Sequence, residues 1–209
     1  MTDRSVTKKR RRRPEARPGE ILAAALALFS KKGFSATRMD EVAARAGVSK
    51  GAIYLYFPDK TALLKALVKQ ATGGQIAQVA QLAENPGGPV APLLRQLILQ
   101  MAWRVESTEL PSIIKLVIAE SRAHPEIGKF YLNNVIGAAL PILERLIRRG
   151  IATGEFREVD VRLAAKCLMG PMLLSAIWRS VFAPLGAEAI DTNSLAALHA
   201  DLFLGGLKT

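Results

Sequence analysis

Residues 38–57 read RMDEVAARAGVSKGAIYLYF and carry the pattern of two short helices joined by a tight turn. Gly47 lies between the two helices, where the turn needs the positive φ angle that glycine adopts without strain. Ser49 is a favourable N-cap, so it begins the second helix and leaves that helix's first N–H groups available to phosphate. The apolar or small residues that let the two helices cross and pack are Val42, Ala43, Ala46, Val48 and Ile53. The stretch therefore predicts a helix-turn-helix.

The second helix of this motif is too short to be stable by its own propensity, so neighbouring helices must hold one of its sides. Its other side is then presented, as in helices that enter the major groove of double-stranded DNA. Presented side chains contact phosphates, which position the protein, or base edges, which specify the sequence. The residues predicted to face DNA are Arg38, Ser49, Lys50, Gly51, Ala52, Tyr54, Tyr56 and Lys60. The alternative is an ordinary helical corner without a DNA partner.

The formal net charge of +11 is concentrated in the first third of the chain. Residues 1–70 hold 16 Lys or Arg against 6 Asp or Glu, whereas residues 71–209 hold 13 against 12. A basic segment joined to a nearly neutral one indicates a polyanionic partner for the basic segment. The densest positive block consists of Lys8, Lys9, Arg10, Arg11, Arg12 and Arg13.

Residues 1–17, which contain this block, are predicted to form a disordered basic arm, because a run of like charges repels itself. One interpretation is that the arm lies along DNA, in the way that the arms of other DNA-binding proteins enter the minor groove. The other is a solubilising tail. If the arm alone bound polyanions, the protein would be a non-specific nucleic-acid-binding protein, which is the alternative function.

Hydrophobic residues recur at helical spacing along the chain, and no run alternates in the way that a half-buried strand does. Thr37 and Asp59 are predicted N-caps, and residues 85–89 form a clear break rich in proline and glycine. The predicted helices cover residues 18–32, 37–47, 49–57, 60–84, 90–106, 110–123, 125–153, 161–183 and 191–206. The predicted fold is all-α, with a three-helix helix-turn-helix domain at 18–65 and a larger helical domain at 66–209.

A set of residues in the first 65 positions also matches a family pattern. The matching residues are Ile21, Leu22, Ala25, Leu28, Phe29, Gly33, Phe34, Ala36, Thr37, Val42, Ala43, those from Ala46 to Tyr54, Tyr56, Phe57, Lys60, Leu63 and Leu64. Together they resemble the N-terminal domain of the TetR family of bacterial repressors. Met39 departs from the pattern, because the family often has at this position a threonine that contacts phosphate.

The resemblance implies a repressor of about nine helices that binds double-stranded DNA as a homodimer. It implies that the C-terminal domain forms the dimer and binds a small-molecule effector that releases the protein from its operator. A two-fold dimer predicts a palindromic operator, and the methionine and aromatic residues of the C-terminal region favour an apolar or amphipathic effector. The positions that it assigns to DNA contact are Thr37, Lys50, Gly51, Tyr54, Tyr56 and Lys60.

Two predicted helices of the C-terminal region contain a proline, Pro141 in one and Pro171 in the other. A proline inside a helix removes a hydrogen bond and bends the helix, so the bundle is expected to pack imperfectly and leave a cavity. The residues predicted to line it are Trp103, Val117, Phe130, Met169, Met172, Leu173 and Trp178. The alternative is that these side chains fill the core. Glu120, Arg122 and His124 are candidates for a polar end of the cavity, although surface charges account for them more simply.

The helices over 161–183 and 191–206 are more apolar than one folded chain would bury. A two-fold dimer that packs these helices as a four-helix bundle would cover them and present two DNA-binding helices. The residues predicted to lie in this interface are Leu174, Leu195, Leu198 and Leu202.

The residues that enzymes, metal-binding proteins and membrane proteins require are not found in the sequence. The only cysteine, Cys167, lies in an apolar run and is predicted to be a buried hydrophobic residue and not a nucleophile. One cysteine and two histidines make a metal site improbable, and no phosphate-binding loop occurs, so neither enzyme activity nor a cofactor is expected.

The longest uncharged apolar segment, Cys167 to Trp178, is shorter than the roughly 20 residues of a membrane span. With no secretory signal in the sequence, a cytoplasmic protein is expected.

Overall fold

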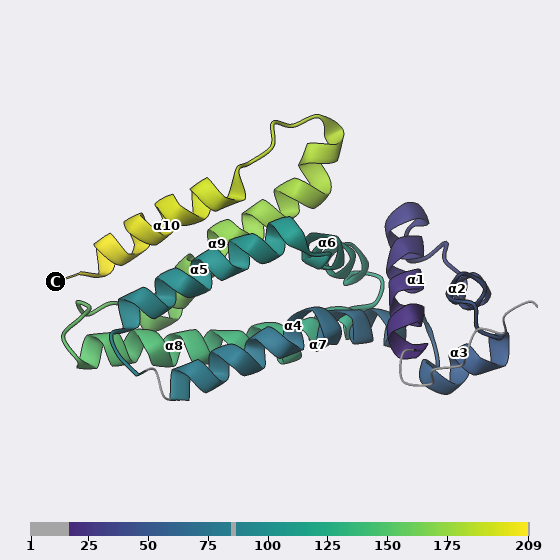
Figure 1. Ribbon diagram of the computed structural model, residues 1–209, viewed down its shortest axis with the longest axis horizontal. Helices are drawn as coiled ribbons and strands as arrows, with labels where there is room; N and C mark the ends of the chain where they lie inside the picture. Colours follow the sequence, from purple (N-terminus) through teal and green to yellow (C-terminus); the bar gives the residue numbers. More distant parts are fainter. Residues whose placement is uncertain (1–16, 85–86, 209) are drawn as a thin grey trace, which may run out of the picture. The chain divides into compact units, whose positions relative to one another are not determined.

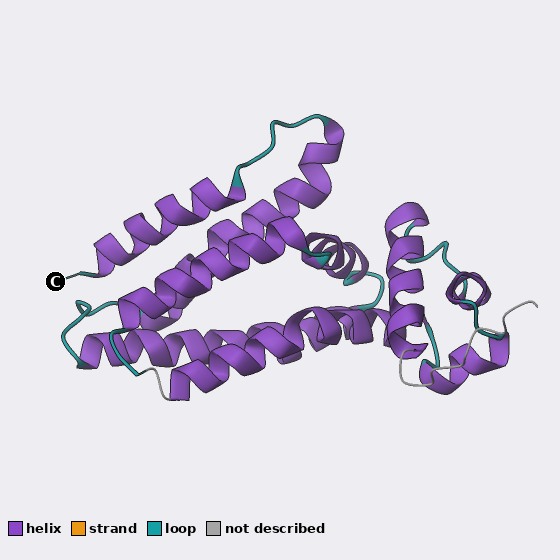
Figure 2. Cartoon of the chain, in the orientation of Figure 1, coloured by secondary structure: helices purple, strands orange, loops and turns teal. Residues whose placement is uncertain are grey.

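The computed structural model describes residues 17–84 and 87–208, and these residues form helices and loops with no strand among them (Figure 2). The predicted all-α fold is confirmed. The basic arm predicted at residues 1–17 lies outside the described residues, apart from the backbone of Arg17. The chain divides into two compact units, residues 1–63 and residues 64–209.

The first unit contains three helices and the beginning of a fourth (Figure 1). Their bounds are α1 (Arg17–Lys32), α2 (Met39–Ala46), α3 (Lys50–Tyr56) and α4 (Lys60–Glu84). α2 packs against α1 on one side and α3 on the other. Residues at helical spacing along α1 provide one buried face, and they meet the apolar residues of α2 and α3 in a small core. The most deeply buried side chains of this core are Ile21, Ala25, Phe29, Phe34, Val42 and Ile53.

The second unit is a larger bundle. Its helices are the rest of α4, α5 (Val90–Ser107), α6 (Leu110–Glu120), α7 (Pro125–Tyr131), α8 (Gly137–Ala152), α9 (Val161–Ile177) and α10 (Thr192–Leu207). The short elements between them are the π-helical turns η2 (Leu132–Ile136) and η3 (Trp178–Phe182) and the 3₁₀ turn η4 (Ala183–Leu185). The sequence predicted the run over 125–153 as one helix, and α7, η2 and α8 do follow one another without a break.

Within this bundle α5 packs along α10, and α9 lies against α5, α8 and α10 (Figure 1). The core between these helices is aliphatic. Its most deeply buried residues are Leu94, Ile98, Ala102, Leu146, Ile147, Ala165, Ala196 and Ala200. The small alanines on α9 and α10 let helices approach closely, while the leucines and isoleucines of α5 and α8 fill the space between them.

Carboxylates fix the starts of three of these helices. Asp160 accepts hydrogen bonds from two backbone N–H groups at the start of α9, and Asp191 does the same for α10. Glu155, which lies in the loop after α8, accepts hydrogen bonds from the N–H groups of Val90 and Ala91, at 2.6 and 2.7 Å. These bonds satisfy donors that a helix leaves unpaired, and a negative charge suits the N-terminal end of a helix.

The helical run over residues 161–185 is long and apolar enough to cross a membrane by length and composition, with a mean hydropathy of 1.3 in its most apolar window. Only 28% of that window is buried within the chain. The prediction that Cys167 is buried is wrong, because its side chain lies on the exposed side of α9. α9 is apolar around most of its circumference, so the sequence did not show which side faces the bundle.

Candidate DNA-binding surface and ligand cavity

The turn between α2 and α3 has the geometry that its glycine predicts. Gly47 adopts a φ of 65° in the left-handed region, and the Val48 N–H donates to the Ala43 carbonyl oxygen at 3.0 Å. These are the features of a helix C-cap that ends in glycine. The chain reverses within two residues, which lets α3 begin close to the end of α2.

Ser49 begins α3 as predicted. Its Oγ accepts a hydrogen bond from the Ala52 N–H at 3.2 Å, which satisfies one of the donors exposed at the start of the helix. Ile53, one turn later, is fully buried and anchors the helix to the first unit. α3 is thus held by one apolar side chain and leaves its remaining sides in contact with solvent.

The exposed side of α3 carries large side chains that the core does not use. Tyr54, Leu55 and Tyr56 are 44%, 86% and 41% exposed. Lys50 is exposed and forms an ion pair with Asp40 of α2, with Nζ and Oδ2 3.0 Å apart. Gly51 adds no side chain, and a Cβ placed there would meet nothing within 4 Å. This surface has the donors and the close backbone access that contact with a DNA groove requires.

Two residues predicted to contact DNA have other roles in the free chain. Thr37 is 1% exposed, and its hydroxyl donates to the Gly33 carbonyl oxygen at 2.8 Å. The N-cap of α2 is therefore Arg38 and not Thr37, and the Glu41 carboxylate accepts a hydrogen bond from the Arg38 N–H at 2.9 Å. The predicted cap was wrong because the buried hydroxyl bonds back to the preceding turn.

Lys60 also has partners within the first unit. Its Nζ donates to the carbonyl oxygens of Phe34 and Ser35, both at 2.9 Å, and lies 5.0 Å from the centroid of the Phe34 ring. The ammonium group therefore satisfies backbone acceptors in the loop between α1 and α2. These bonds use two of the three ammonium donors, so one N–H of Lys60 is left for a phosphate.

An ion pair adds to the contacts between α1 and α2. Lys32, in the last turn of α1, pairs with Glu41 of α2. The hydrogen bond from Lys32, followed by the one from the Arg38 backbone, lowers the pKa of the Glu41 carboxyl below its usual range. Glu41 is therefore ionised at neutral pH, where it holds both the α1 lysine and the start of α2.

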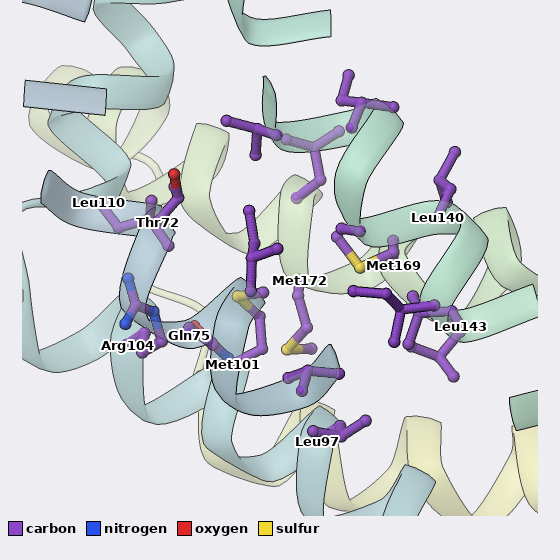
Figure 3. Close-up of a pocket in the computed structure, with 18 of the residues that line it drawn as sticks. Thr72, Gln75, Leu97, Met101, Arg104, Leu110, Leu140, Leu143, Met169 and Met172 are labelled. Carbon is purple, nitrogen blue, oxygen red and sulfur yellow. The ribbon is translucent and has the colours of Figure 1, made fainter. Parts of the chain in front are cut away.

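The second unit contains a cavity of about 320 Å³ that is partly open to solvent, at the lower end of the range for small-molecule sites. Residues from α4, α5, α6, α7, η2, α8 and α9 line it, and most of them are aliphatic or methionine. Figure 3 shows Leu97, Met101, Leu143, Met169 and Met172 among these walls. Methionine is unbranched and flexible, so the walls are able to adapt to an apolar occupant.

An apolar face on α9 and α10 is left uncovered by the rest of the second unit. Leu163 and Leu174 of α9 are 57% and 50% exposed, and Leu198 and Leu202 of α10 are 55% and 67% exposed. Cys167 and Gly170 lie between the two leucines of α9 at helical spacing, so the face is a continuous stripe. Leu195, also predicted to lie in the interface, is partly buried against the core.

Two family models match the chain, and together they span most of it. The model for bacterial regulatory proteins of the tetR family matches residues 21–67, and the model for the tetracyclin repressor-like C-terminal domain matches residues 86–193. The chain belongs to the TetR family. The N-terminal match covers the helix-turn-helix, and the C-terminal match covers most of the bundle that holds the cavity.

Several TetR-family regulators are similar to this chain. The fatty acid metabolism regulator protein of Bacillus subtilis is 26% identical over 152 residues, which are 72% of this chain and 77% of that protein. RutR of Escherichia coli K12 is 30% identical over 148 residues, which are 70% of this chain but 61% of the longer RutR. The crystal structure of FadR from Bacillus subtilis in complex with stearoyl-CoA has a TM-score of 0.73 at 24% identity, and covers 90% of this chain and 98% of that one.

The cavity of this TetR-family protein includes three of the seven residues predicted to line it, namely Met169, Met172 and Leu173. The others lie elsewhere. Trp103 is 59% exposed, Val117 is buried in packing outside the cavity, and Trp178 donates its Nε1–H to the Glu188 carbonyl oxygen at 2.7 Å. Phe130 lies beneath the Lys65 ammonium group, 5.9 Å from it.

The sequence-based prediction did not include the polar residues that line the cavity. Thr72 and Gln75 of α4, Arg104 of α5 and Tyr131 of α7 line it, whereas Glu120, Arg122 and His124 do not. Polar residues in a helix usually face solvent, so the sequence alone did not identify Thr72, Gln75 and Tyr131 as cavity residues. The spacing of the apolar residues on α5 carried a usable signal, because it places Arg104 nearer the buried side than Trp103.

Proposed function

We propose that the chain is a cytoplasmic, homodimeric repressor that leaves a palindromic DNA operator when a small apolar or amphipathic effector binds in the second unit. The presented side of α3 carries this proposal. A helix anchored by one buried isoleucine, with two exposed tyrosines and a glycine that admits close approach, suits entry into the major groove.

The cavity supports the effector. A space of about 320 Å³ with methionine and leucine walls suits an apolar molecule and not a sugar or a nucleotide, which would need many polar partners. FadR of Bacillus subtilis, which shares this fold, was solved with stearoyl-CoA, a ligand that carries a long apolar chain.

The stripe on α9 and α10 supports the dimer. It exposes four leucines on two adjacent helices, and a two-fold partner would cover the same stripe with its own copy. The low buried fraction of the apolar run over 161–185 has the same explanation, since an interface helix is covered only in the dimer. Two copies of α3 in one dimer suit a palindromic site.

Release follows from a shift between two states of the dimer. One state matches the spacing of the two operator half-sites, and the other does not. An effector that binds the second state more tightly shifts the population toward it, by an amount set by its difference in affinity for the two states. Tight binding without such a difference would leave operator affinity unchanged.

The experiment is a selection of DNA sequences from a random library by the purified full-length protein, followed by fluorescence anisotropy with the selected DNA and a scrambled DNA at two salt concentrations. We expect a preference for the selected DNA that persists at the higher salt concentration. Tyr54→Ala should weaken this binding about tenfold, in keeping with the loss of one good contact. Ile118→Ala, at an exposed apolar residue of α6, is the control and should bind as tightly as the wild type.

Removal of residues 1–17 separates this function from non-specific binding through the basic arm. We expect weaker binding, a smaller dependence on salt and a retained sequence preference. If the truncated protein loses all binding, or if the selection yields no preferred sequence, the arm alone accounts for the affinity and the proposed function is wrong.

A further inference from the structure

The charged residues that line the cavity are of one sign. Among the described lining residues, Arg104 of α5 and Lys166 of α9 are cationic, and none is Asp or Glu. Lys166 is exposed, so water solvates its ammonium group. Arg104 is the cation that the protein itself partly encloses.

The Arg104 guanidinium is incompletely paired. Its Nη2 donates to the Ala71 carbonyl oxygen of α4, but its Nε is buried and has no hydrogen-bond partner among the described residues. Burial also lowers the pKa of Arg104, because the charged form loses hydration. A buried donor on a charged group is costly to leave unpaired, and no carboxylate of the cavity wall offsets its charge.

Two further polar residues of the cavity, Thr72 and Gln75, lie on the same side as Arg104. Figure 3 shows Thr72, Gln75 and Arg104 on one side of the cavity, and Leu140, Leu143 and Met169 on the other. The Thr72 hydroxyl already donates to the Val68 carbonyl oxygen at 2.8 Å. Burial raises the pKa of the Tyr131 phenol, so this wall residue remains a neutral O–H donor. The side of the cavity that holds Arg104 thus carries polar side chains of α4 and α5, whereas leucines and a methionine of α8 and α9 lie opposite.

We infer that the cavity binds an organic acid with an apolar chain, and that Arg104 is the residue that receives its carboxylate. The chain lies against the leucines and methionines, and the carboxylate accepts hydrogen bonds from the guanidinium, including the unpaired Nε–H. A planar guanidinium suits a carboxylate because it offers two parallel donors. The inference rests on the proposed function, since it names the chemical class of the effector.

The test is isothermal titration calorimetry of the full-length protein with dodecanoate and with dodecanol, both below the concentration at which they aggregate. The two probes share a chain and differ in the head group. We expect dodecanoate to bind at least about tenfold more tightly, because one charge-assisted hydrogen bond is worth that much or more.

Arg104→Gln should reduce this preference to about twofold or less and leave the affinity for dodecanol nearly unchanged. Arg104→Lys, which keeps the charge but not the paired donors, should retain part of the preference. Lys166→Gln removes the other cation of the wall and is the matched control, with an expected effect of less than about threefold. Thermal unfolding without ligand shows whether each variant is folded.

The inference is overturned by equal binding of dodecanoate and dodecanol, by a preference that survives in folded Arg104→Gln, or by a preference lost in Lys166→Gln alone. Dodecanoyl-CoA, which has a thioester in place of the carboxylate, is a further probe. If it binds much more tightly than dodecanoate, the head group recognised is not a carboxylate. DNA binding without ligand is measured in parallel. If the carboxylate preference is absent but the protein still prefers its selected DNA, only the inference about the effector is wrong and the proposed function is retained.

Discussion

Two glycines of the helix-turn-helix have different physical reasons to be glycine. Gly47 has a φ of 65°, which a residue with a Cβ adopts only at a cost of roughly 1–2 kcal/mol. Gly51 lies inside α3 with ordinary helical geometry and open space around it. The first residue therefore serves the turn, whereas the second leaves room for a partner on the presented side of α3.

These roles are separable by alanine substitution. We expect Gly47→Ala to lower the free energy of unfolding by about 1 kcal/mol, because the methyl group strains the left-handed turn. Gly51→Ala should leave stability unchanged or raise it by up to about 1 kcal/mol, since alanine favours helix. Urea unfolding measures both, and anisotropy should show that Gly51→Ala weakens binding to the selected DNA. Equal stability losses in the two variants would contradict this division.

Helices were easier to predict than the sides that they bury. Capping residues and apolar spacing located the described helices to within a few residues, because those signals are local. The cavity wall was harder, since core and cavity positions use the same side chains. Trp103 and Arg104 show the difficulty: neighbouring residues point about 100° apart on a helix, and the structure buries part of the arginine and exposes the tryptophan.

The spacing of the buried residues on α5 distinguishes Trp103 from Arg104. Its buried residues Leu94, Ile98 and Val105 define one side of the helix, and Trp103 lies off that side. On α9, by contrast, apolar residues surround the helix, so their spacing does not indicate whether Cys167 faces the bundle or solvent. No sequence pattern predicted the positions of the two π-helical turns.

The end of α8 depends on a close approach that has no room for a side chain. A Cβ on Gly150 would lie 2.1 Å from Cδ2 of Phe156, whose ring is buried in the core of the second unit. Gly150→Ala must displace that ring, and we expect it to lower the free energy of unfolding by roughly 1–3 kcal/mol. Gly74→Ala, in the middle of α4 with nothing within 4 Å, is the control and should be neutral or stabilising. Urea unfolding of both variants decides whether the contact is as tight as described.

The exposed leucines of α9 and α10 have a function if two chains assemble through them. A charged residue in the centre of an apolar interface is costly because it is desolvated without a partner. If the stripe on α9 and α10 is the interface, a single charge there should separate the dimer. The same charge at an exposed apolar position outside the interface should leave the dimer intact, because water continues to solvate it.

Leu198→Asp on α10 makes this prediction specific. Sedimentation equilibrium should show a dimer for the wild type and a monomer for Leu198→Asp at micromolar concentration, with helix content retained in circular dichroism. Affinity for the palindromic DNA should fall at least about tenfold, because two linked α3 helices bind together far more tightly than one. Ile118→Asp, at a residue of α6 that is equally exposed, should remain a dimer. A dimer that survives Leu198→Asp but not Ile118→Asp would move the interface to α6, and the apolar stripe would then need another explanation.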